Sequence, residues 1–150
     1  MPTAAHQTAA LLGSDSSLLV MPWPEREPDD AGHDVRSRYA ELFVLPVLGP
    51  TGTWLLRRLA DGLDTFPDGY ELDLVETARA LGLGYVPGRI GPFTRALERC
   101  VMFGYAAPVP YGLAVHRRIG TLAARQVERL PEHLRRLHEV EMRQRPLRTA

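Results

Sequence analysis

The sequence PFTRALERCVMFG, at residues 92–104, has the apolar spacing of a helix. Five apolar residues, from Phe93 to Val101, occupy positions i, i+3, i+4, i+7 and i+8, which lie on one face of an α-helix. Pro92 suits the first helical turn, where its missing N–H is no loss, and Gly104 ends the pattern. These features predict a helix with one buried face. The opposite face presents Thr94, Arg95, Glu98 and Arg99.

A second helix is predicted just upstream, in LDLVETARALGL at residues 72–83. Asp73 has the side chain of a helix N-cap, and Glu76, three residues later, completes a capping box. Gly82 stops this helix after a buried stripe of apolar residues. The next stretch, residues 84–91, contains three glycines and a proline, and we expect a turn there.

Prolines, glycines and apolar periodicity place the other expected elements. They are a short helix from Arg36 to Pro46, a helix that begins at Pro50, a strand at residues 70–72, a β-hairpin at residues 105–109 and 113–119, and a final helical region over about residues 121–145, divided at Pro131. The expected fold class is therefore α+β, mainly α with a small β-hairpin.

Residues 1–35 have no sustained periodicity and contain four prolines and a string of acidic residues. This composition predicts a disordered acidic, proline-rich arm. The apolar patch at residues 18–23 either docks on a protein partner or lies against the protein's own domain. The predicted domains are the arm at residues 1–35, a folded domain at residues 36–120 and a C-terminal helical extension at residues 121–150.

The composition narrows the class of protein. The chain has 150 residues, with 18 Arg plus Lys against 18 Asp plus Glu, and one cysteine, Cys100. That is the length of one domain, and a single Cys excludes a disulfide framework and a zinc site built from several cysteines. The longest apolar stretch, residues 42–48, is far short of the roughly 20 residues of a membrane-spanning helix. No basic residue precedes Arg26, so we expect no signal peptide and a cytoplasmic protein.

The formal net charge of zero hides an uneven distribution. Residues 1–34 carry six acidic residues and one Arg, whereas residues 89–150 carry five acidic residues and twelve Arg, a net charge of +7. All the basic residues are Arg, which codon bias in a GC-rich genome would produce by itself. A basic C-terminal part is nevertheless typical of a protein that binds a polyanion.

The order of these elements resembles a winged helix-turn-helix DNA-binding domain over about residues 38–119. The resemblance is carried by TRALERCVMFGYA at residues 94–106 and by LDLVETARALGL at residues 72–83. It implies that the helix from Pro92 enters the DNA major groove and that the hairpin lies beside the backbone or over the minor groove. The expected function is DNA binding in transcription regulation. Winged helices also bind proteins, so an interaction adaptor without direct DNA binding is the alternative.

Arg side chains around this helix are the candidate DNA contacts. Arg95 is best placed for two hydrogen bonds to a guanine edge. Residues in the turn before the helix and at the hairpin would contact phosphates. The candidate DNA-binding residues are Arg89, Thr94, Arg95, Arg99, Arg117 and Arg118. An ordinary solvated surface is the alternative interpretation of the same residues.

Spacing supports no other chemistry. His133 and His138 are five residues apart, about 140° around a helix, and would not share a metal. Gly82-Leu83-Gly84 lacks the Lys of a phosphate loop, and Cys100 on the apolar helix face is predicted to be a packed thiol. We therefore expect no enzyme, no metal and no cofactor. Double-stranded DNA is the expected partner, and a homodimer through residues 121–145 and a protein partner for the arm stay open.

Overall fold

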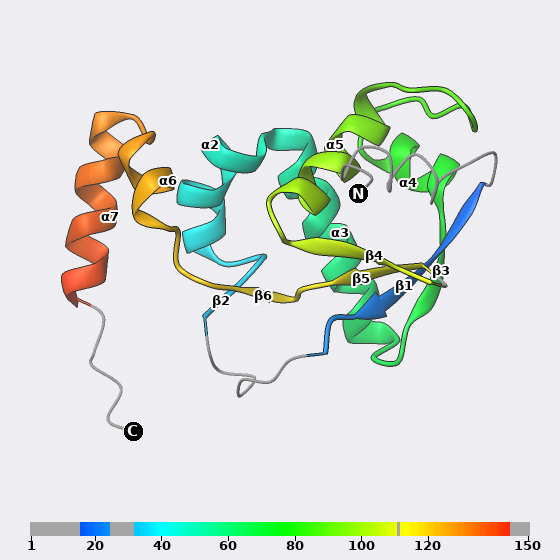
Figure 1. The fold of residues 1–150 in the computed structure, drawn as a ribbon, viewed down its shortest axis with the longest axis horizontal. Helices are drawn as coiled ribbons and strands as arrows, with labels where there is room; N and C mark the ends of the chain where they lie inside the picture. Colours follow the sequence, from blue (N-terminus) through cyan, green and yellow to red (C-terminus); the bar gives the residue numbers. More distant parts are fainter. Residues whose placement is uncertain (1–15, 25–31, 111, 145–150) are drawn as a thin grey trace.

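The structure is a computed structural model that describes residues 16–24, 32–110 and 112–144. Helices pack against a small four-stranded sheet, which confirms the predicted α+β class (Figure 1). The elements in chain order are β1 (Ser17–Pro22), β2 (His33–Asp34), the π-helical turn η1 (Ala40–Val44), α2 (Leu45–Leu48), α3 (Pro50–Thr65), β3 (Tyr70–Asp73), α4 (Leu74–Ala80), α5 (Pro92–Met102), β4 (Ala106–Val109), β5 (Gly112–Val115), β6 (Arg118–Ile119), α6 (Ala124–Glu128) and α7 (Glu132–Gln144).

The first strand corrects the prediction of a disordered arm. β1 lies inside the sheet, whose strand order is β3-β1-β5-β4. It pairs antiparallel with β3, where Leu18 is opposite Leu72, and parallel with β5, where Val20 is opposite Leu113. Leu18 and Val20 are buried, so the segment is held by apolar contacts as well as by backbone hydrogen bonds. The rest of the predicted arm, at residues 1–15 and 25–31, lies outside the described residues.

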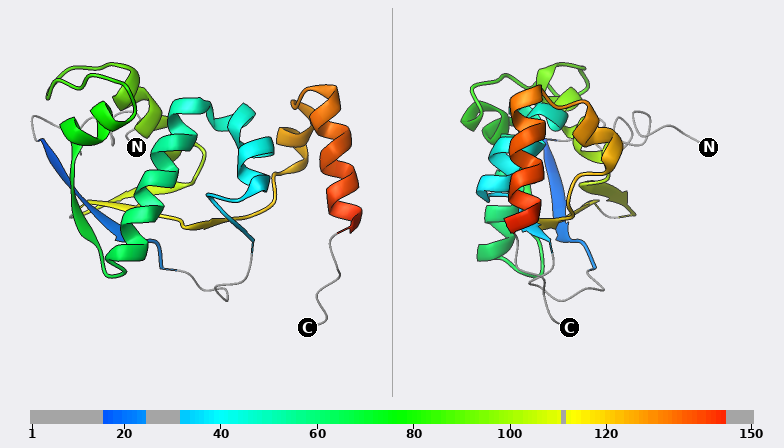
Figure 2. Two further views of the ribbon diagram at one scale, coloured as in Figure 1. Left: turned by 180° about the vertical axis from the view of Figure 1, so that it is seen from behind. Right: turned by 90° about the vertical axis from the view of Figure 1, so that its left-hand side faces the viewer.

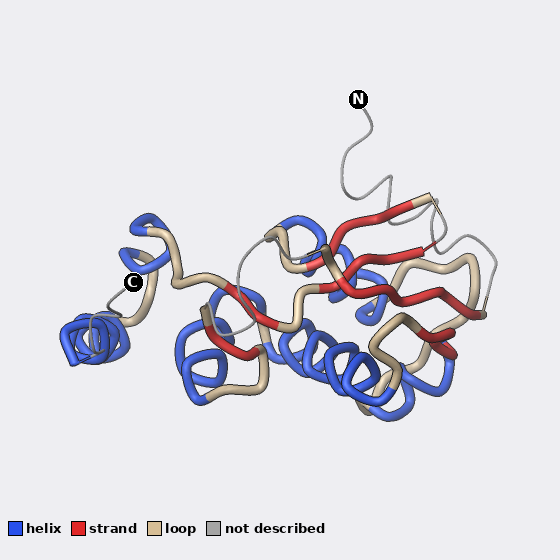
Figure 3. Tube along the Cα trace, turned by 90° about the horizontal axis from the view of Figure 1, so that it is seen from below, coloured by secondary structure: helices blue, strands red, loops and turns tan. Residues whose placement is uncertain are grey.

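The core lies between the sheet and the helices around α3. This helix contacts β1, β5, η1, α2 and α5, and its predicted apolar face is buried. Figure 2 shows α3 crossing the body of the protein from α2 to the turn before β3. Figure 3 shows the sheet and its helices at one end of the molecule and α6 with α7 at the other. The fold thus presents α5 and the α4–α5 loop far from the C-terminal helices.

The prediction that Pro46 ends the first helix is wrong, because the helical backbone widens before the proline and continues past it. η1 leads directly into α2, in which Pro46 occupies the first turn. A proline in a regular helix clashes with the carbonyl group four residues earlier and lacks an N–H to donate. The wider π-helical turn at residues 40–44 moves those carbonyls, and the N–H of Leu45 instead donates to the carbonyl of Ala40. The helix ends two residues later than Pro46, at Leu48, before Gly49 with a φ of 87°.

The predicted hairpin is shorter than expected. β4 and β5 form it, with Ala107 opposite Ala114, but its second strand ends at Val115. The chain then leaves this sheet, and β6 pairs with β2, where Asp34 is opposite Arg118. β5 is buried along its whole length because it lies between β1 and β4. The second strand of the hairpin is therefore internal to the sheet, whereas the first, β4, lies at its edge.

Two features depart from the expected winged helix. β1 separates β3 from the hairpin, and the second hairpin strand is covered on both sides by neighbouring strands. The connection from α4 to α5 is also long, covering residues 81–91, whereas a helix-turn-helix joins its helices by a turn of about three or four residues. The order of the elements from α3 to β5 is nevertheless the predicted one.

The C-terminal region is divided near Pro131, as predicted, into α6 and α7. Leu122 and Leu130 are buried in the protein's own core. α7 is attached to η1 through a buried hydrogen bond of 2.7 Å between the hydroxyl of Tyr39 and Nε2 of His138. Within the described residues, no helix has the length and apolar character needed to cross a membrane.

Candidate nucleic-acid interface

α5 is held firmly against α3 by its buried face. Phe93, Leu97 and Cys100 are buried, and Sγ of Cys100 lies 3.6 Å from the carbonyl oxygen of Gly52 in α3. A side chain at Gly52 would meet Cγ of Leu48 at 3.0 Å, so glycine leaves room for the Leu48 side chain of α2 beside this contact. Burial raises the pKa of the Cys100 thiol to about 12. Its burial confirms the packed thiol that the apolar pattern predicts.

Thr94 fixes the start of α5. Its hydroxyl accepts a hydrogen bond of 2.8 Å from the N–H of Gly91 and donates one of 2.9 Å to the carbonyl of the same residue. Both hydrogen-bonding functions of the side chain are therefore used at the helix terminus. Thr94 is better described as a capping residue than as the DNA contact that the resemblance implies.

Arg95 faces solvent on α5. It lies one turn into the helix, on an exposed stripe that also includes Pro92, Arg99 and Met102. Within the described part of the chain, no group forms a hydrogen bond or ion pair with its guanidinium. A rigid helix therefore presents five N–H donors to whatever lies against this face.

Arg99 is partly used inside the protein. Its Nη2 donates a hydrogen bond of 2.9 Å to the carbonyl of Val47 at the end of α2, and its guanidinium lies 5.8 Å from the centre of the Phe103 ring. This contact ties α5 to α2. This hydrogen bond uses one of the five N–H groups of an exposed side chain, so Arg99 is both a structural link and part of the basic face.

Arg89 lies in the loop that leads into α5. The loop starts where Gly82, with a φ of 75°, ends α4, and the N–H of Leu83 donates to the carbonyl of Ala78 over 2.9 Å. Tyr85 is buried, with its ring centre 5.4 Å from that of Phe93 in α5. Arg89 itself is exposed. The loop is thus fastened at Tyr85 and carries Arg89 beside the start of α5.

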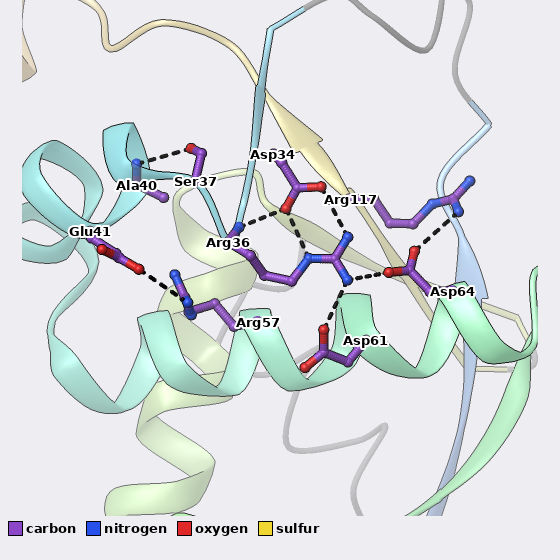
Figure 4. Close-up of polar contacts among 9 residues, drawn as sticks. All are labelled: Asp34, Arg36, Ser37, Ala40, Glu41, Arg57, Asp61, Asp64 and Arg117. Carbon is purple, nitrogen blue, oxygen red and sulfur yellow. Dashed lines mark hydrogen bonds and ion pairs between the residues drawn. The ribbon is translucent and has the colours of Figure 1, made fainter.

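Arg117 and Arg118 lie away from α5, at the two-stranded sheet formed by β2 and β6. Arg117 forms an ion pair of 3.7 Å with Asp64 near the end of α3 (Figure 4). Nη2 of Arg118 donates a hydrogen bond of 3.0 Å to the carbonyl of Gly32. Asp64 is about 18 Å along the α3 axis from Gly52, the residue that α5 contacts. The six candidate residues therefore divide into two groups, and Arg117 and Arg118 do not extend the face of α5.

Arg36 is the centre of a charge cluster that the sequence did not indicate. Its Nε and Nη2 donate to the two carboxylate oxygens of Asp34 over 2.9 Å each, and its Nη1 donates to Asp61 over 2.8 Å and to Asp64 (Figure 4). These hydrogen bonds lower the pKa of the Asp34 carboxyl and raise that of the Arg36 guanidinium. Arg117 joins the same cluster through Asp64. The cluster links β2 to α3, and its charges largely neutralise one another.

The charge near α5 is different. Between Glu76 and Glu98 the sequence has three Arg, at positions 79, 89 and 95, and no acidic residue. The α4–α5 loop and the first turn of α5 therefore contain Arg side chains but no acidic residue. In the described ranges, His, Cys, Asp and Glu side chains form no cluster of three or more that could hold a metal ion.

Comparisons with protein-family models, with curated proteins and with solved structures found no match to this chain.

Proposed function

We propose that the protein binds duplex DNA through the exposed face of α5, as a divergent winged helix-turn-helix protein that acts in transcription regulation. The order α3, β3, α4, α5, β4, β5 supports this proposal, since it is the order of helices and strands in that class. The observation that carries it is the exposed guanidinium of Arg95, which no described residue pairs with, on a helix that is fixed by its buried face.

The chemistry of this face suits the major groove. An Arg guanidinium donates two parallel hydrogen bonds to O6 and N7 of guanine, and the N-terminal residues of a recognition helix are those that reach base edges. Arg89 and Arg99 add positive charge on either side of Arg95, where phosphates flank the groove. DNA binding would also agree with the predicted cytoplasmic location.

The alternative is a protein-interaction adaptor. It is favoured by the covered second strand of the hairpin, because β5 lies between β1 and β4 and does not project from the sheet as the strand of a wing would. It is also favoured by Met102, an exposed apolar side chain on the same stripe as Arg95.

An electrophoretic mobility shift with a pool of random duplexes separates the two functions. The DNA-binding function predicts a shift that weakens as salt is raised, because phosphate contacts release counterions. Arg95→Ala should weaken the shift, whereas Arg129→Ala, which removes an exposed Arg beside α6, should leave it unchanged. No shift by the wild-type protein, even at low salt, would contradict DNA binding and favour the adaptor.

The proposal includes a homodimer through the C-terminal region. α7 contacts η1 and α6 only along part of its surface, and Val140 is exposed on it. An open groove of about 480 Å³ beside α7 is lined by the apolar residues Val127 and Met142 and by charged residues that include Arg135 and Glu139. Apolar residues flanked by charges of both signs suit a two-fold contact between identical surfaces. Leu122 and Leu130 are buried in the same chain and do not take part.

A further inference from the structure

The loop before α5 ends in a rigid turn. The N–H of Arg89 donates a hydrogen bond of 3.0 Å to the carbonyl of Val86, which closes a four-residue β-turn. Pro87 occupies its second position and Gly88, with a φ of 85°, its third. Pro at the second position and a glycine with positive φ at the third define a type II turn, whose backbone is nearly fixed before any partner arrives.

This turn is anchored at both ends. Tyr85, immediately before it, is buried and packs on Phe93, and Gly91, just after it, is joined to Thr94 by two hydrogen bonds. The turn therefore keeps a constant position relative to α5. Whatever partner lies along α5 also meets the tip of this loop.

The side chains at the tip are apolar as well as basic. Ile90 is 77% exposed, more than any other large hydrophobic residue in the described ranges, and Val86 is 55% exposed. Arg89 lies between them in the sequence, with no acidic residue from position 77 to position 97. An apolar pair that surrounds an Arg in an acid-free segment fits a partner with both negative charge and apolar surface. Duplex DNA has these two properties in the minor groove, where sugars and base edges lie between rows of phosphates.

The hairpin of this sheet is not in a position to contact the minor groove. In the winged helix the hairpin is expected over the minor groove, but here β4 ends at Val109 and β5 begins at Gly112, so the connection is short. A side chain at Gly112 would meet the carbonyl oxygen of Leu19 at 2.0 Å, which shows how closely β1 covers the hairpin. The hairpin is therefore poorly placed to act as a wing, and the α4–α5 loop projects beside α5 in its place (Figure 1).

We propose that the turn at residues 86–90 enters the DNA minor groove next to the major-groove site of α5, with Arg89 in the groove and Val86 and Ile90 against sugars and base edges. This inference rests on the proposed DNA-binding function. Narrow A·T-rich minor grooves have an enhanced negative potential that attracts Arg, so the turn should favour A·T base pairs beside the sequence that α5 contacts.

Fluorescence anisotropy on a selected duplex, with its flank either A·T-rich or G·C-rich, tests the inference. Ile90→Ala should weaken binding roughly tenfold, as expected when one aliphatic side chain loses its buried contact, without changing the salt dependence. Arg89→Ala should lower the slope of log affinity against log salt by about one and reduce the preference for the A·T flank. Phe66→Ala is the control, because Phe66 is also exposed but lies at the other end of α3.

Netropsin, a small ligand of A·T minor grooves, supplies an independent readout. Saturating the A·T flank with netropsin should weaken the wild-type protein more than Ile90→Ala does, because it also blocks Arg89 and Val86, and it should have much less effect on a variant that combines Arg89→Ala with Ile90→Ala. If Ile90→Ala and netropsin leave affinity unchanged while Arg95→Ala weakens it, the turn proposal is overturned and DNA binding by α5 stands. If the wild-type protein binds no duplex, or binds only anionic phosphatidylserine vesicles, both proposals are overturned.

Discussion

The hydroxyl of Tyr39 lies 2.7 Å from Nε2 of His138 and joins α7 to η1. The same hydroxyl accepts a hydrogen bond of 2.9 Å from the N–H of Leu122. Its own proton is therefore available to Nε2, so the contact favours an imidazole that is unprotonated at that nitrogen. His138 is only 6% exposed, and its ring meets the Phe43 ring edge-on, at 4.9 Å between centres.

The attachment of α7 should be pH-dependent. Burial lowers the pKa of His138, and the nearby Glu141 carboxylate, which pairs with Arg38, opposes this effect. The unfolded state therefore binds a proton at higher pH than the folded state does, and stability falls on acidification. This contribution is fully present above about pH 6.5, the unfolded value, and is lost as the pH falls through the lower folded value.

Urea unfolding at a series of pH values measures this effect. We expect the wild-type protein to lose stability on acidification below about pH 6.5, where histidine in the unfolded chain becomes protonated. His138→Gln keeps a hydrogen-bond acceptor but does not titrate, so it should lose less. His133→Gln, at an exposed position of the same helix, should behave like the wild-type protein. Parallel curves for the wild-type protein and His138→Gln would exclude His138 as the titrating group.

β1 should be essential for stability. Leu18→Ala removes a buried side chain and should cost about 2–5 kcal/mol in the free energy of unfolding. Leu19→Ala, at the next position on the exposed face of the strand, should cost about 0.5 kcal/mol or less. Denaturant unfolding of both variants checks this difference. Equal stabilities of the two variants would mean that residues 17–22 are not packed in the sheet and belong to the disordered arm that the composition predicts.

The Arg36 cluster should contribute to stability through partly buried hydrogen bonds. Arg36→Met removes the hydrogen bonds to Asp34, Asp61 and Asp64, leaves Arg117 beside Asp64, and should cost roughly 1–2 kcal/mol at neutral pH, as for partly exposed charged hydrogen bonds. Because the pKa of Asp34 is lowered from 3.8, the difference between the proteins is present above that value and disappears as the pH falls through the lowered one.

Denaturant unfolding with a matched variant isolates this contribution. Arg136→Met removes the exposed pair with Glu132 one turn earlier on α7 and should cost less than about 0.5 kcal/mol. A cost for Arg36→Met no larger than this would mean that the cluster is merely a set of solvated charges.

Arg95 should determine the preference for one base pair. Arg95→Ala should cost roughly 1–3 kcal/mol at a single guanine and flatten the preference there, while the fold is retained because the side chain is exposed. Arg99→Ala should instead weaken binding to all sequences and also lower stability slightly, because its hydrogen bond to Val47 is lost. Selection of sites from a random duplex pool compares the proteins. Identical preferences with and without Arg95 would argue against α5 as the recognition helix.

The dimer should depend on the exposed part of α7. Val140→Glu places a charge on this surface and should convert a dimer to a monomer, whereas Glu128→Gln, in α6, should have no effect on mass in solution. Analytical ultracentrifugation of the full chain makes the measurement. A wild-type protein that sediments as a monomer over a wide concentration range would remove the dimer, and with it the two half-sites about 34–36 Å apart that symmetric dimers read.

Local features could be predicted because they depend on residues three or four positions apart. The cap of α4 is confirmed, since the N–H of Glu76 donates to Asp73 over 2.9 Å, and Gly104 ends α5 with a φ of 79°. β1 could not be predicted in this way, because its partners β3 and β5 are distant in the sequence and its own segment is flanked by prolines and acidic residues. Its alternation of buried and exposed residues covers too few positions to stand out.

The candidate site was predictable to a similar degree. The buried face of α5 and the exposure of Arg95 followed from helical periodicity, and that part of the interpretation is confirmed. The prediction that Arg117 and Arg118 lie at the hairpin was wrong. Their side chains instead contact Asp64 and Gly32, which are distant in the sequence and come close only in the folded chain. The acid-free segment around Arg89 was visible in the sequence and would have drawn attention to the exposed turn.

The central position of β1 has a consequence for synthesis of the protein. This strand is made before all of the helices that the structure describes, yet its parallel partner β5 is made only after residue 111. The sheet cannot close while the intervening helices are being made, and its parallel pairing has a high contact order, which slows folding. Until β5 has been made, the apolar side chains of Leu18 and Val20, which are buried in the folded protein, lie on a strand that lacks its parallel partner. Chaperone binding during translation would therefore be directed to β1, well before α5 has been made.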